Sequence, residues 1–188
     1  MSSSAEQSIA GWVSALAARQ PTPGGGGAAA IAAAIGAAAG AMSARYTTGK
    51  RWEDRAEQAE ALATQLDQVA ADCLALADED AAAYLALQAS WKATDMDASE
   101  REAIAGRALA VPLRLVATCA EAADLLVAFL TSCNPQIVSD AKVGIHLLAG
   151  AGRAGWQTLL VNQPDATTRA QAEQALATLA ASERTALG

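Results

Sequence analysis

Apolar residues recur along the chain at the spacing of α-helices, and the strict alternation typical of half-buried strands is absent. The clearest stretch is residues 28–43, which carries no charge and contains only Ala, Ile, Gly, Met and Ser. A segment that is apolar on all sides is a buried helix or a membrane span. We therefore predict a helix over about residues 26–47. Its small residues recur every four positions and would let another helix approach closely: Ala32, Gly36 and Gly40.

A second long helix is predicted from Trp52 to Trp91. Its apolar ladder has steps that alternate between four and three, as in a heptad seam: Leu62, Leu66, Val69, Cys73, Leu76, Asp80, Ala83 and Leu87. Asp80 is the only charged member of this seam. A carboxylate on a core seam is costly unless it is paired, hydrogen-bonded or protonated. Asp80 is therefore either a functional residue or a boundary residue that reaches water or a basic neighbour.

Caps and helix breakers predict the other boundaries. Ser4 followed by Gln7 resembles a capping box for a helix over about 5–19, with one apolar face formed by Ile9, Trp12, Val13 and Leu16. Ser99 is the predicted cap of a helix that reaches Pro112, where the cost of ~3 kcal/mol for an interior proline predicts a kink or a new start. Further helices are predicted over 113–133, 140–161 (capped by Ser139) and 165–182. Residues 1–188 are thus predicted to form one all-α domain, a helical bundle with long central helices.

Composition narrows the classes of function. The net charge of −7 argues against nucleic acid as the main partner. A membrane span is not predicted at 28–43, because alanine and glycine are weakly apolar and the run falls short of ~20 residues. The N-terminus lacks the basic and apolar regions of a secretory signal. Three cysteines in apolar contexts indicate reduced core residues of a cytoplasmic protein: Cys73, Cys119 and Cys133.

The loop from Pro21 to Gly27 holds two prolines and four consecutive glycines, which do not belong in the body of a helix. It leads directly into the uncharged helix and so places free N–H groups at a positive helix end. This arrangement favours a ligand-binding loop, although the glycines could instead serve close packing alone. A dinucleotide fingerprint is disfavoured because no strand precedes the loop. A Walker A motif is excluded because Gly49-Lys50 is followed by Arg51.

Acid–base chemistry is the kind of catalysis that the remaining candidates favour. Lys50 ends a turn and lies near several arginines in sequence, and Asp140 follows the predicted cap, where it would also complement the helix dipole. His146 is the only histidine, so a histidine-rich metal site or a His-activated nucleophile is not predicted, and we expect it to have a local partner in its helix. Lys and Asp are therefore the expected acid and base.

Together these residues resemble the cyclodeaminase/cyclohydrolase family, which comprises the C-terminal domain of formiminotransferase-cyclodeaminase and stand-alone methenyltetrahydrofolate cyclohydrolases. The match begins with residues 21–30 and continues in order through 48–50, 78–84, 111–113 and 134–141, closing at 161–162. The resemblance spans about residues 6 to 163. It implies an all-helical homodimer that acts on a tetrahydrofolate derivative without a tightly bound cofactor or metal.

The resemblance also implies roles for particular residues. Lys50, Asp80 and Asp140 are the expected catalytic residues. The expected substrate-binding residues are Pro23, Gly24, Gly25, Gly26, Gly27, Arg45, Tyr84, Asn134, Ser139 and Lys142. Arg45, Arg51, Lys142 and Arg153 are candidates for a basic rim around the glutamate tail. Arg45 and Lys142 depart from what relatives commonly carry and could mark an altered substrate.

Because no formiminotransferase domain is attached, a cyclohydrolase is the favoured activity. A cyclodeaminase is the alternative, and a non-catalytic helical dimer or folate-binding module is a third possibility of another class. About twenty residues of helix, ~30 Å, separate the glycine loop from Lys50. We therefore expect the site to be completed across a dimer interface.

Overall fold

The computed structural model describes residues 3–188, and within that range it contains helices and no strand. The all-α prediction is confirmed; residues 1 and 2 of the predicted domain lie outside the described part of the chain. The elements are two short 3₁₀ turns, η1 (Ser4–Glu6) and η2 (Lys50–Trp52), and the α-helices α1 (Ile9–Ala17), α2 (Gly25–Arg45), α3 (Ala56–Lys92), α4 (Ala98–Phe129), α5 (Val138–Val161) and α6 (Ala166–Leu187).

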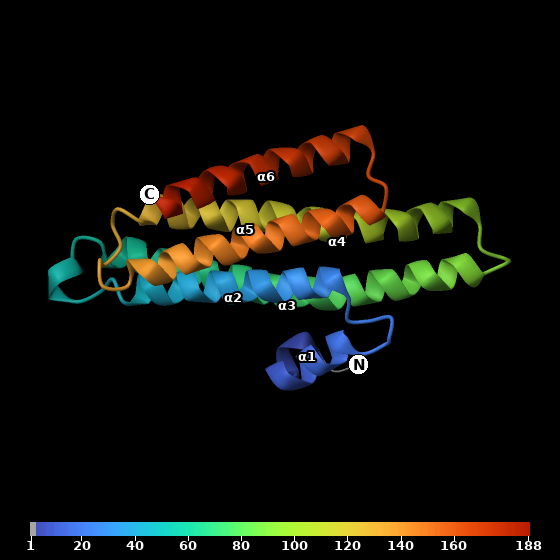
Figure 1. Ribbon diagram of the computed structural model, residues 1–188, viewed down its shortest axis with the longest axis horizontal. Helices are drawn as coiled ribbons and strands as arrows, with labels where there is room; N and C mark the ends of the chain where they lie inside the picture. The colour runs from blue at the N-terminus through green and yellow to red at the C-terminus, as the bar shows by residue number, and fades with distance from the viewer. Residues whose placement is uncertain (1–2) are drawn as a thin grey trace.

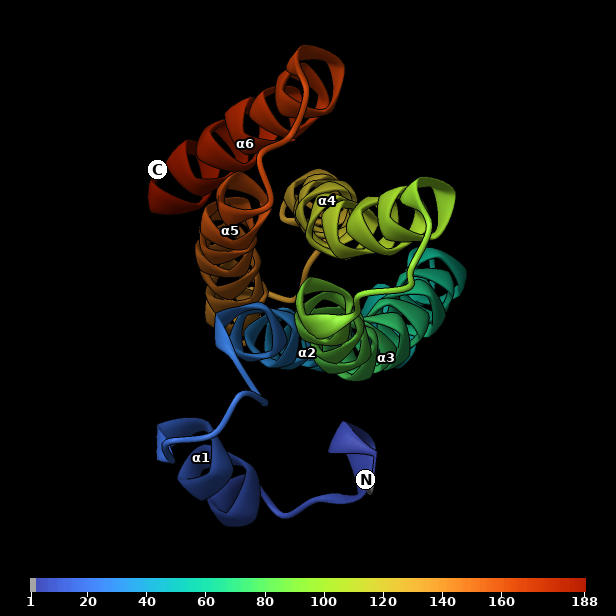
Figure 2. The same cartoon turned by 90° about the vertical axis from the view of Figure 1, so that its right-hand side faces the viewer.

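Helices α2 to α6 form an elongated bundle, shown from the side in Figure 1 and from one end in Figure 2. α2 and α3 lie side by side, α4 and α5 cover them, and α6 lies outermost. α1 and the N-terminus lie on the opposite side of α2 and α3, apart from the bundle. α2 is the central element, since it packs against both α3 and α5.

Close backbone approach explains the small residues of α2. A Cβ atom on Gly36 would lie 3.1 Å from the carbonyl oxygen of Gly144 in α5, and one on Gly144 would lie 2.8 Å from the carbonyl oxygen of Gly36. At Gly40 the same atom would lie 2.7 Å from the side chain of Leu126. The predicted close crossing at Gly36 and Gly40 is therefore confirmed, and its partner is α5.

Larger side chains fill the spaces around these crossings. Of the predicted α3 seam, Leu62, Leu66, Cys73 and Leu76 are buried. All three cysteines are buried and free, as predicted. α2 and α4 are long and apolar enough to pass a test for membrane spans, but 61% of the most apolar window of α2 is buried inside the protein. A core helix of a folded domain passes the same test.

The prediction for the first helix is wrong in its extent and its face. The segment divides into η1 and α1, and Ser8 rather than Ser4 caps α1, through a bond of 3.1 Å from the Gly11 N–H. Only Trp12 is buried, whereas Ile9 and Val13 are 81% and 55% exposed. The physical reason is that α1 lies apart from the bundle (Figure 2).

No new helix starts at Pro112, because α4 runs unbroken from Ala98 to Phe129 through that residue, while the kink that was the other predicted outcome stays a prediction. Pro112 is itself buried among α4 residues that face the core, and packing holds the helix through it. The cap is Asp97, whose carboxylate accepts from the Glu100 N–H at 2.8 Å, and not Ser99.

The remaining boundaries differ by a few residues from those predicted. α3 begins at Ala56 because Lys50–Trp52 form η2. α5 begins at Val138 without a side-chain cap, so Ser139 lies inside the helix rather than before it. The predicted start of the last helix at residue 165 is confirmed to within one residue, since Asp165 caps α6 and accepts from the Thr168 N–H at 2.7 Å. Finally, the prediction of a local partner for His146 is wrong, because its Nδ1 lies 3.3 Å from Oε1 of Glu183, 37 residues away on α6.

Candidate active site

The glycine loop opens α2, and a carboxylate from another helix caps it. The N-cap residue Gly24 has no side chain to bond the free N–H groups of the first turn. Asp80 of α3 supplies the acceptor instead, since Oδ2 accepts from the Gly27 N–H at 3.0 Å. Gly27 is the third residue of α2, the position that an ordinary N-cap side chain would bond. The N–H group that the sequence offered to a ligand anion is thus already bonded to Asp80.

Gly26 makes this pairing possible. A Cβ atom at Gly26 would lie 2.1 Å from Oδ1 of Asp80 and 2.5 Å from its carboxyl carbon, distances that no real contact shows. A Cβ at Gly24 or Gly25 would meet nothing within 4 Å. Of these loop glycines, Gly26 is therefore the one that the position of Asp80 strictly requires.

The environment of Asp80 suits proton transfer. Partial burial raises the pKa of its carboxyl group, and the bond from the Gly27 N–H opposes that rise. In residues 3–188 no ion pair with a basic side chain lowers it again. Oδ2 is held by the helix, which leaves Oδ1 available to a ligand.

The neighbours of Asp80 in sequence are used differently, because successive helix positions point about 100° apart. Asp78 accepts from the Ser3 hydroxyl at 2.8 Å and the Ser4 N–H at 2.9 Å, and so holds the N-terminal segment. Glu79 pairs with Arg114 of α4 at 2.7 Å. Asp80 is the member of this acidic run that faces the space beside the glycine loop.

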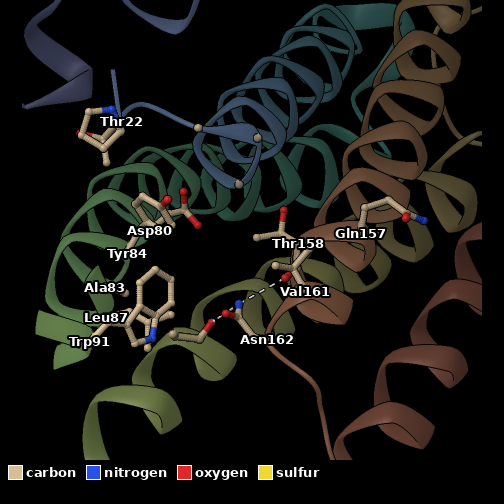
Figure 3. A pocket seen from close by; sticks show the side chains of 15 residues that line it. Thr22, Asp80, Ala83, Tyr84, Leu87, Trp91, Gln157, Thr158, Val161 and Asn162 are labelled. Carbon is tan, nitrogen blue, oxygen red and sulfur yellow. Dashed lines mark hydrogen bonds between the residues drawn. The ribbon is translucent and has the colours of Figure 1, made fainter. Parts of the chain in front are cut away.

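That space is a cleft of about 490 Å³, large enough for a small organic molecule. Figure 3 shows α3 side chains on one side and the end of α5 on the other. The lining residues come from the loop, from α3, from α4 and from α5: Pro21, Thr22, Gly24, Gly25, Gly26, Asp80, Ala83, Tyr84, Leu87, Trp91, Ala108, Gln157, Thr158, Val161 and Asn162. None of these lining residues is basic, so Asp80 sets the charge of the cleft.

A proline in α4 and an asparagine at the end of α5 complete the wall of the cleft. Pro112 has no N–H group, so the carbonyl of Ala108, four residues earlier, lacks its helical donor. The side chain of Asn162 supplies one, since Nδ2 donates to Ala108 O at 3.0 Å and to Thr158 O at 3.2 Å. Both Nδ2 bonds are to backbone, which leaves the Asn162 Oδ1 as an acceptor at the cleft wall (Figure 3).

Several other predicted site residues lie at the opposite end of α2. Asn134 joins the turns there, with its N–H donating to Thr47 Oγ1 at 3.0 Å and its Nδ2 donating to Tyr46 O at 3.1 Å. Ser139 donates to Asp140 Oδ2 at 3.3 Å. Lys50 is exposed in η2, where no hydrogen bond or ion pair of its side chain is formed with the described residues.

The predicted basic rim does not surround the cleft. Arg45 pairs with Asp67 and lowers the pKa of that carboxyl group. The guanidinium of Arg51 stacks over Trp52, 5.2 Å from the ring centre, and Arg153 pairs with Glu183 of α6. Lys142 lies near the start of α5, away from the cleft lining.

The structure thus divides the predicted residues into two groups. Gly24, Gly25, Gly26, Asp80 and Tyr84 line one cleft, with Gly27 bonded to Asp80. Pro23 instead lines a separate hollow beneath α1. The second group, at the other end of α2, holds Lys50, Arg45, Asn134, Ser139, Asp140 and Lys142. Since α2 has 21 residues, the two groups are ~30 Å apart within one chain.

Sequence reasoning missed the residues that complete the cleft. The heptad pattern places Leu87 in the core and Trp91 at a helix end, although positions 80, 84, 87 and 91 share one face. Asn162 belongs to a segment that matches the family but has no role assigned from the sequence. The role of Asn162 depends on its pairing with a distant proline inside a helix. The spacing of residues along the chain does not reveal such a pairing.

Comparisons with known proteins show the family to which the chain belongs. A family model described as formiminotransferase-cyclodeaminase matches residues 8–181. The chain belongs to that family. The methenyltetrahydrofolate cyclohydrolase of Methylorubrum extorquens is 33% identical, over 90% of this chain and 86% of that protein. The formimidoyltransferase-cyclodeaminase of Mus musculus is 30% identical over 86% of this chain, which spans only 31% of the mouse protein.

A solved structure shares the family's fold. The formiminotetrahydrofolate cyclodeaminase of Thermotoga maritima superposes with a TM-score of 0.86, covering 97% of this chain and 94% of that one at 22% identity. The family resemblance of the sequence and the predicted helical fold are both confirmed.

Proposed function

We propose that this protein is a methenyltetrahydrofolate cyclohydrolase, which converts 5,10-methenyltetrahydrofolate and water to 10-formyltetrahydrofolate. The observation that carries the proposal is the half-buried Asp80 at the mouth of a ligand-sized cleft, in a chain that matches a cyclohydrolase over most of both lengths. Partial burial raises the pKa of this carboxyl group and one of its oxygens is free, so it can accept a proton or a hydrogen bond from the substrate.

The proposed reaction needs three proton transfers. Water adds to the methenyl carbon between N5 and N10, and the attacking water gives one proton to a carboxylate. The bond from this carbon to N5 then breaks as N5 gains a proton, and loss of the hydroxyl proton leaves a formyl group on N10. One water is consumed and one proton is released. Asp80 or Asp140 would act as the base, and Lys50 would stabilise the developing oxygen or protonate N5.

The second candidate is a cyclodeaminase, which would close 5-formiminotetrahydrofolate to the methenyl compound and release ammonia. The names of the mouse and Thermotoga relatives favour it. The methenyl chromophore distinguishes the two candidates. The purified protein should remove it from 5,10-methenyltetrahydrofolate faster than buffer does, and it should not generate it from 5-formiminotetrahydrofolate. Gain of chromophore in the second assay would instead establish a cyclodeaminase, and no change in either assay would contradict both.

A homodimer is part of the proposal, because one chain does not bring Asp80 and Lys50 together. α2 carries no charged side chain before Arg45, yet Ile35 is 52% exposed and Met42 is 38% exposed on its surface. Two copies related by a two-fold axis across α2 would lie antiparallel. The Asp80 end of one copy would then face the Lys50 end of its partner, as a shared site requires.

Mixing two inactive variants tests the shared site. Lys50→Met and Asp80→Asn should each lose at least about 100-fold in kcat. When the two are unfolded together and refolded as a mixture, half of the dimers combine both variants, and each mixed dimer holds one intact site. About a quarter of the wild-type activity should return. If activity stays at the level of the separate variants while the mixture is folded and dimeric, Lys50 and Asp80 do not share a site across the interface.

A further inference from the structure

An aromatic and apolar stripe continues from Asp80 along the cleft side of α3. Tyr84, Leu87 and Trp91 follow Asp80 at steps of four, three and four residues, so all of them lie on one helix face and all line the cleft. Trp91 is 64% exposed and Tyr84 is 38% exposed. A tryptophan that lines a cleft and is this exposed offers a large apolar surface that the protein itself leaves uncovered.

The end of α3 that carries Trp91 is held in place. The Arg101 guanidinium of α4 donates to the carbonyl of Ser90 and, at 2.6 Å, to that of Ala93. Across the cleft stands Val161, which is 80% exposed, together with Ala108 of α4. The indole therefore stands on a fixed wall and faces other apolar groups, an arrangement suited to a flat ring (Figure 3).

We propose that Trp91 is the stacking platform for the p-aminobenzoyl ring of the substrate, with the pterin edge placed at Asp80. This proposal rests on the proposed function, since it requires a folate ligand. Eleven residues separate Asp80 from Trp91, which is ~16 Å along the helix axis. One ring system cannot touch both, whereas a folate carries two ring systems joined by a short bridge.

Chemistry assigns the two rings to the two ends. The amino-pyrimidine edge of a pterin presents N–H donors, which match the free oxygen of Asp80. In this placement Asp80 binds the substrate, and Asp140 is the base of the proposed reaction. The p-aminobenzoyl ring presents an aromatic face, which matches Trp91 and Leu87. Within one chain no basic residue lines the cleft, so the glutamate tail does not pair with a cation of the same chain inside it.

Two fragments of the substrate test the assignment, each titrated into the protein and followed by NMR. Trp91→Ala should weaken binding of p-aminobenzoylglutamate roughly tenfold and leave binding of 6-methylpterin unchanged. Asp80→Asn should do the reverse. In the turnover assay Trp91→Ala should raise KM by a similar factor with kcat within about twofold, and Trp91→Phe should restore most of the loss. Leu187→Ala removes another exposed apolar side chain, 73% exposed and outside the cleft, and should change neither fragment's affinity.

The outcomes separate this proposal from the function on which it rests. Wild-type turnover with unchanged binding of p-aminobenzoylglutamate to Trp91→Ala would overturn the role of Trp91 and keep the cyclohydrolase. Weaker binding of both fragments to Trp91→Ala would also overturn it, because the indole would then support the whole cleft. A wild-type protein that neither turns over the folates nor binds either fragment would overturn the proposed function itself.

Discussion

The two ends of α2 carry opposite halves of what the proposed reaction needs. At the N-terminal end a carboxylate, a cleft and an aromatic wall meet, and no basic residue lines the cleft. At the C-terminal end Lys50 is exposed and unpaired among the described residues, and the surrounding turns are closed by hydrogen bonds of Thr47 and Asn134. One end has a pocket without a cation, and the other has a cation outside that pocket.

This difference has a physical origin in how each end of α2 is capped. Asp80 lies 53 residues after Gly27 in sequence and caps the N-terminus of α2. The same side chain also lines the cleft. At the C-terminus the Asn134 side chain bonds the Tyr46 carbonyl, and the Thr47 hydroxyl bonds the Ser43 carbonyl at 2.9 Å. The second set of caps consists of neutral groups that bond one another, and Lys50 takes no part in them. Only at the N-terminal end of α2, therefore, does the residue that caps the helix also line the cleft.

The largest effect is expected from Gly26→Ala. The new methyl group would overlap the Asp80 carboxylate and displace it from the Gly27 N–H. Misplacement of a catalytic group by about 1 Å can cost about 10²-fold in rate, so kcat/KM in the methenyl assay should fall at least that far. Circular dichroism should show that the bundle remains folded.

Two other glycines provide matched comparisons for that variant. Gly25→Ala adds its methyl group one residue earlier, where nothing lies within 4 Å, so Asp80 keeps its place and the loss should be below about tenfold. Gly106→Ala, in an exposed part of α4, should raise stability by up to about 1 kcal/mol and leave activity unchanged. Equal losses in the Gly25 and Gly26 variants would show that the loop, and not the position of Asp80, limits the reaction.

An intermediate effect is expected where Asn162 compensates for Pro112. Asn162→Ala would leave the Ala108 carbonyl without a donor in a partly buried place, which should cost about 1–3 kcal/mol in urea unfolding. Asn134→Ala removes similar side-chain bonds at the exposed opposite end and should cost less than about 1 kcal/mol. The two asparagines thus compare the two ends of the bundle directly.

A double-mutant cycle shows whether the compensation is real. Pro112→Ala restores an N–H group that can bond the Ala108 carbonyl in the ordinary helical way. In that background Asn162→Ala should cost markedly less than it does in the wild type. Additive losses would mean that Asn162 stabilises the end of α5 by some other contact.

The sequence predicted the parts of this structure that depend on local pattern. The uncharged run after Gly27 was long enough to specify a buried helix, and its glycines at four-residue spacing specified a close crossing. The α3 seam placed Asp80 at the boundary of the core. These features follow from periodicity, which a single helix carries in its own residues.

The features that the sequence did not predict depend on partners far away in the chain. α4 continues through Pro112 because burial holds it, while the carbonyl freed by the proline is satisfied by Asn162 at the end of another helix. The apolar spacing of α1 suggested a packed face, but α1 lies apart from the bundle. Within one chain the candidates for a basic rim lie away from the cleft, and Arg45 and Arg153 each pair with an acidic side chain on another helix. Pairings of this kind are decided by the fold and not by spacing.

The smallest effect concerns the free energy of unfolding. Its dependence on pH should differ between variants at the two ends of α2. Burial raises the pKa of Asp80 above its ordinary value of 3.8, so the folded state binds this proton more tightly than the unfolded state. The favourable contribution of the protonated carboxyl is complete below that ordinary value and is lost as the pH rises through the folded-state pKa.

The amide introduced by Asp80→Asn cannot ionise, and its oxygen can still accept from the Gly27 N–H. In urea unfolding the variant should therefore gain stability relative to wild type as the pH rises above 3.8 and through the folded-state pKa of Asp80, although it has lost activity. Lys50→Met, altered at the exposed end, should show no such dependence. If Asp80→Asn instead loses stability relative to wild type as the pH rises, then the charge of Asp80 stabilises the α2 N-terminus by more than burial costs it, and the carboxylate at that end is a structural cap before it is a base.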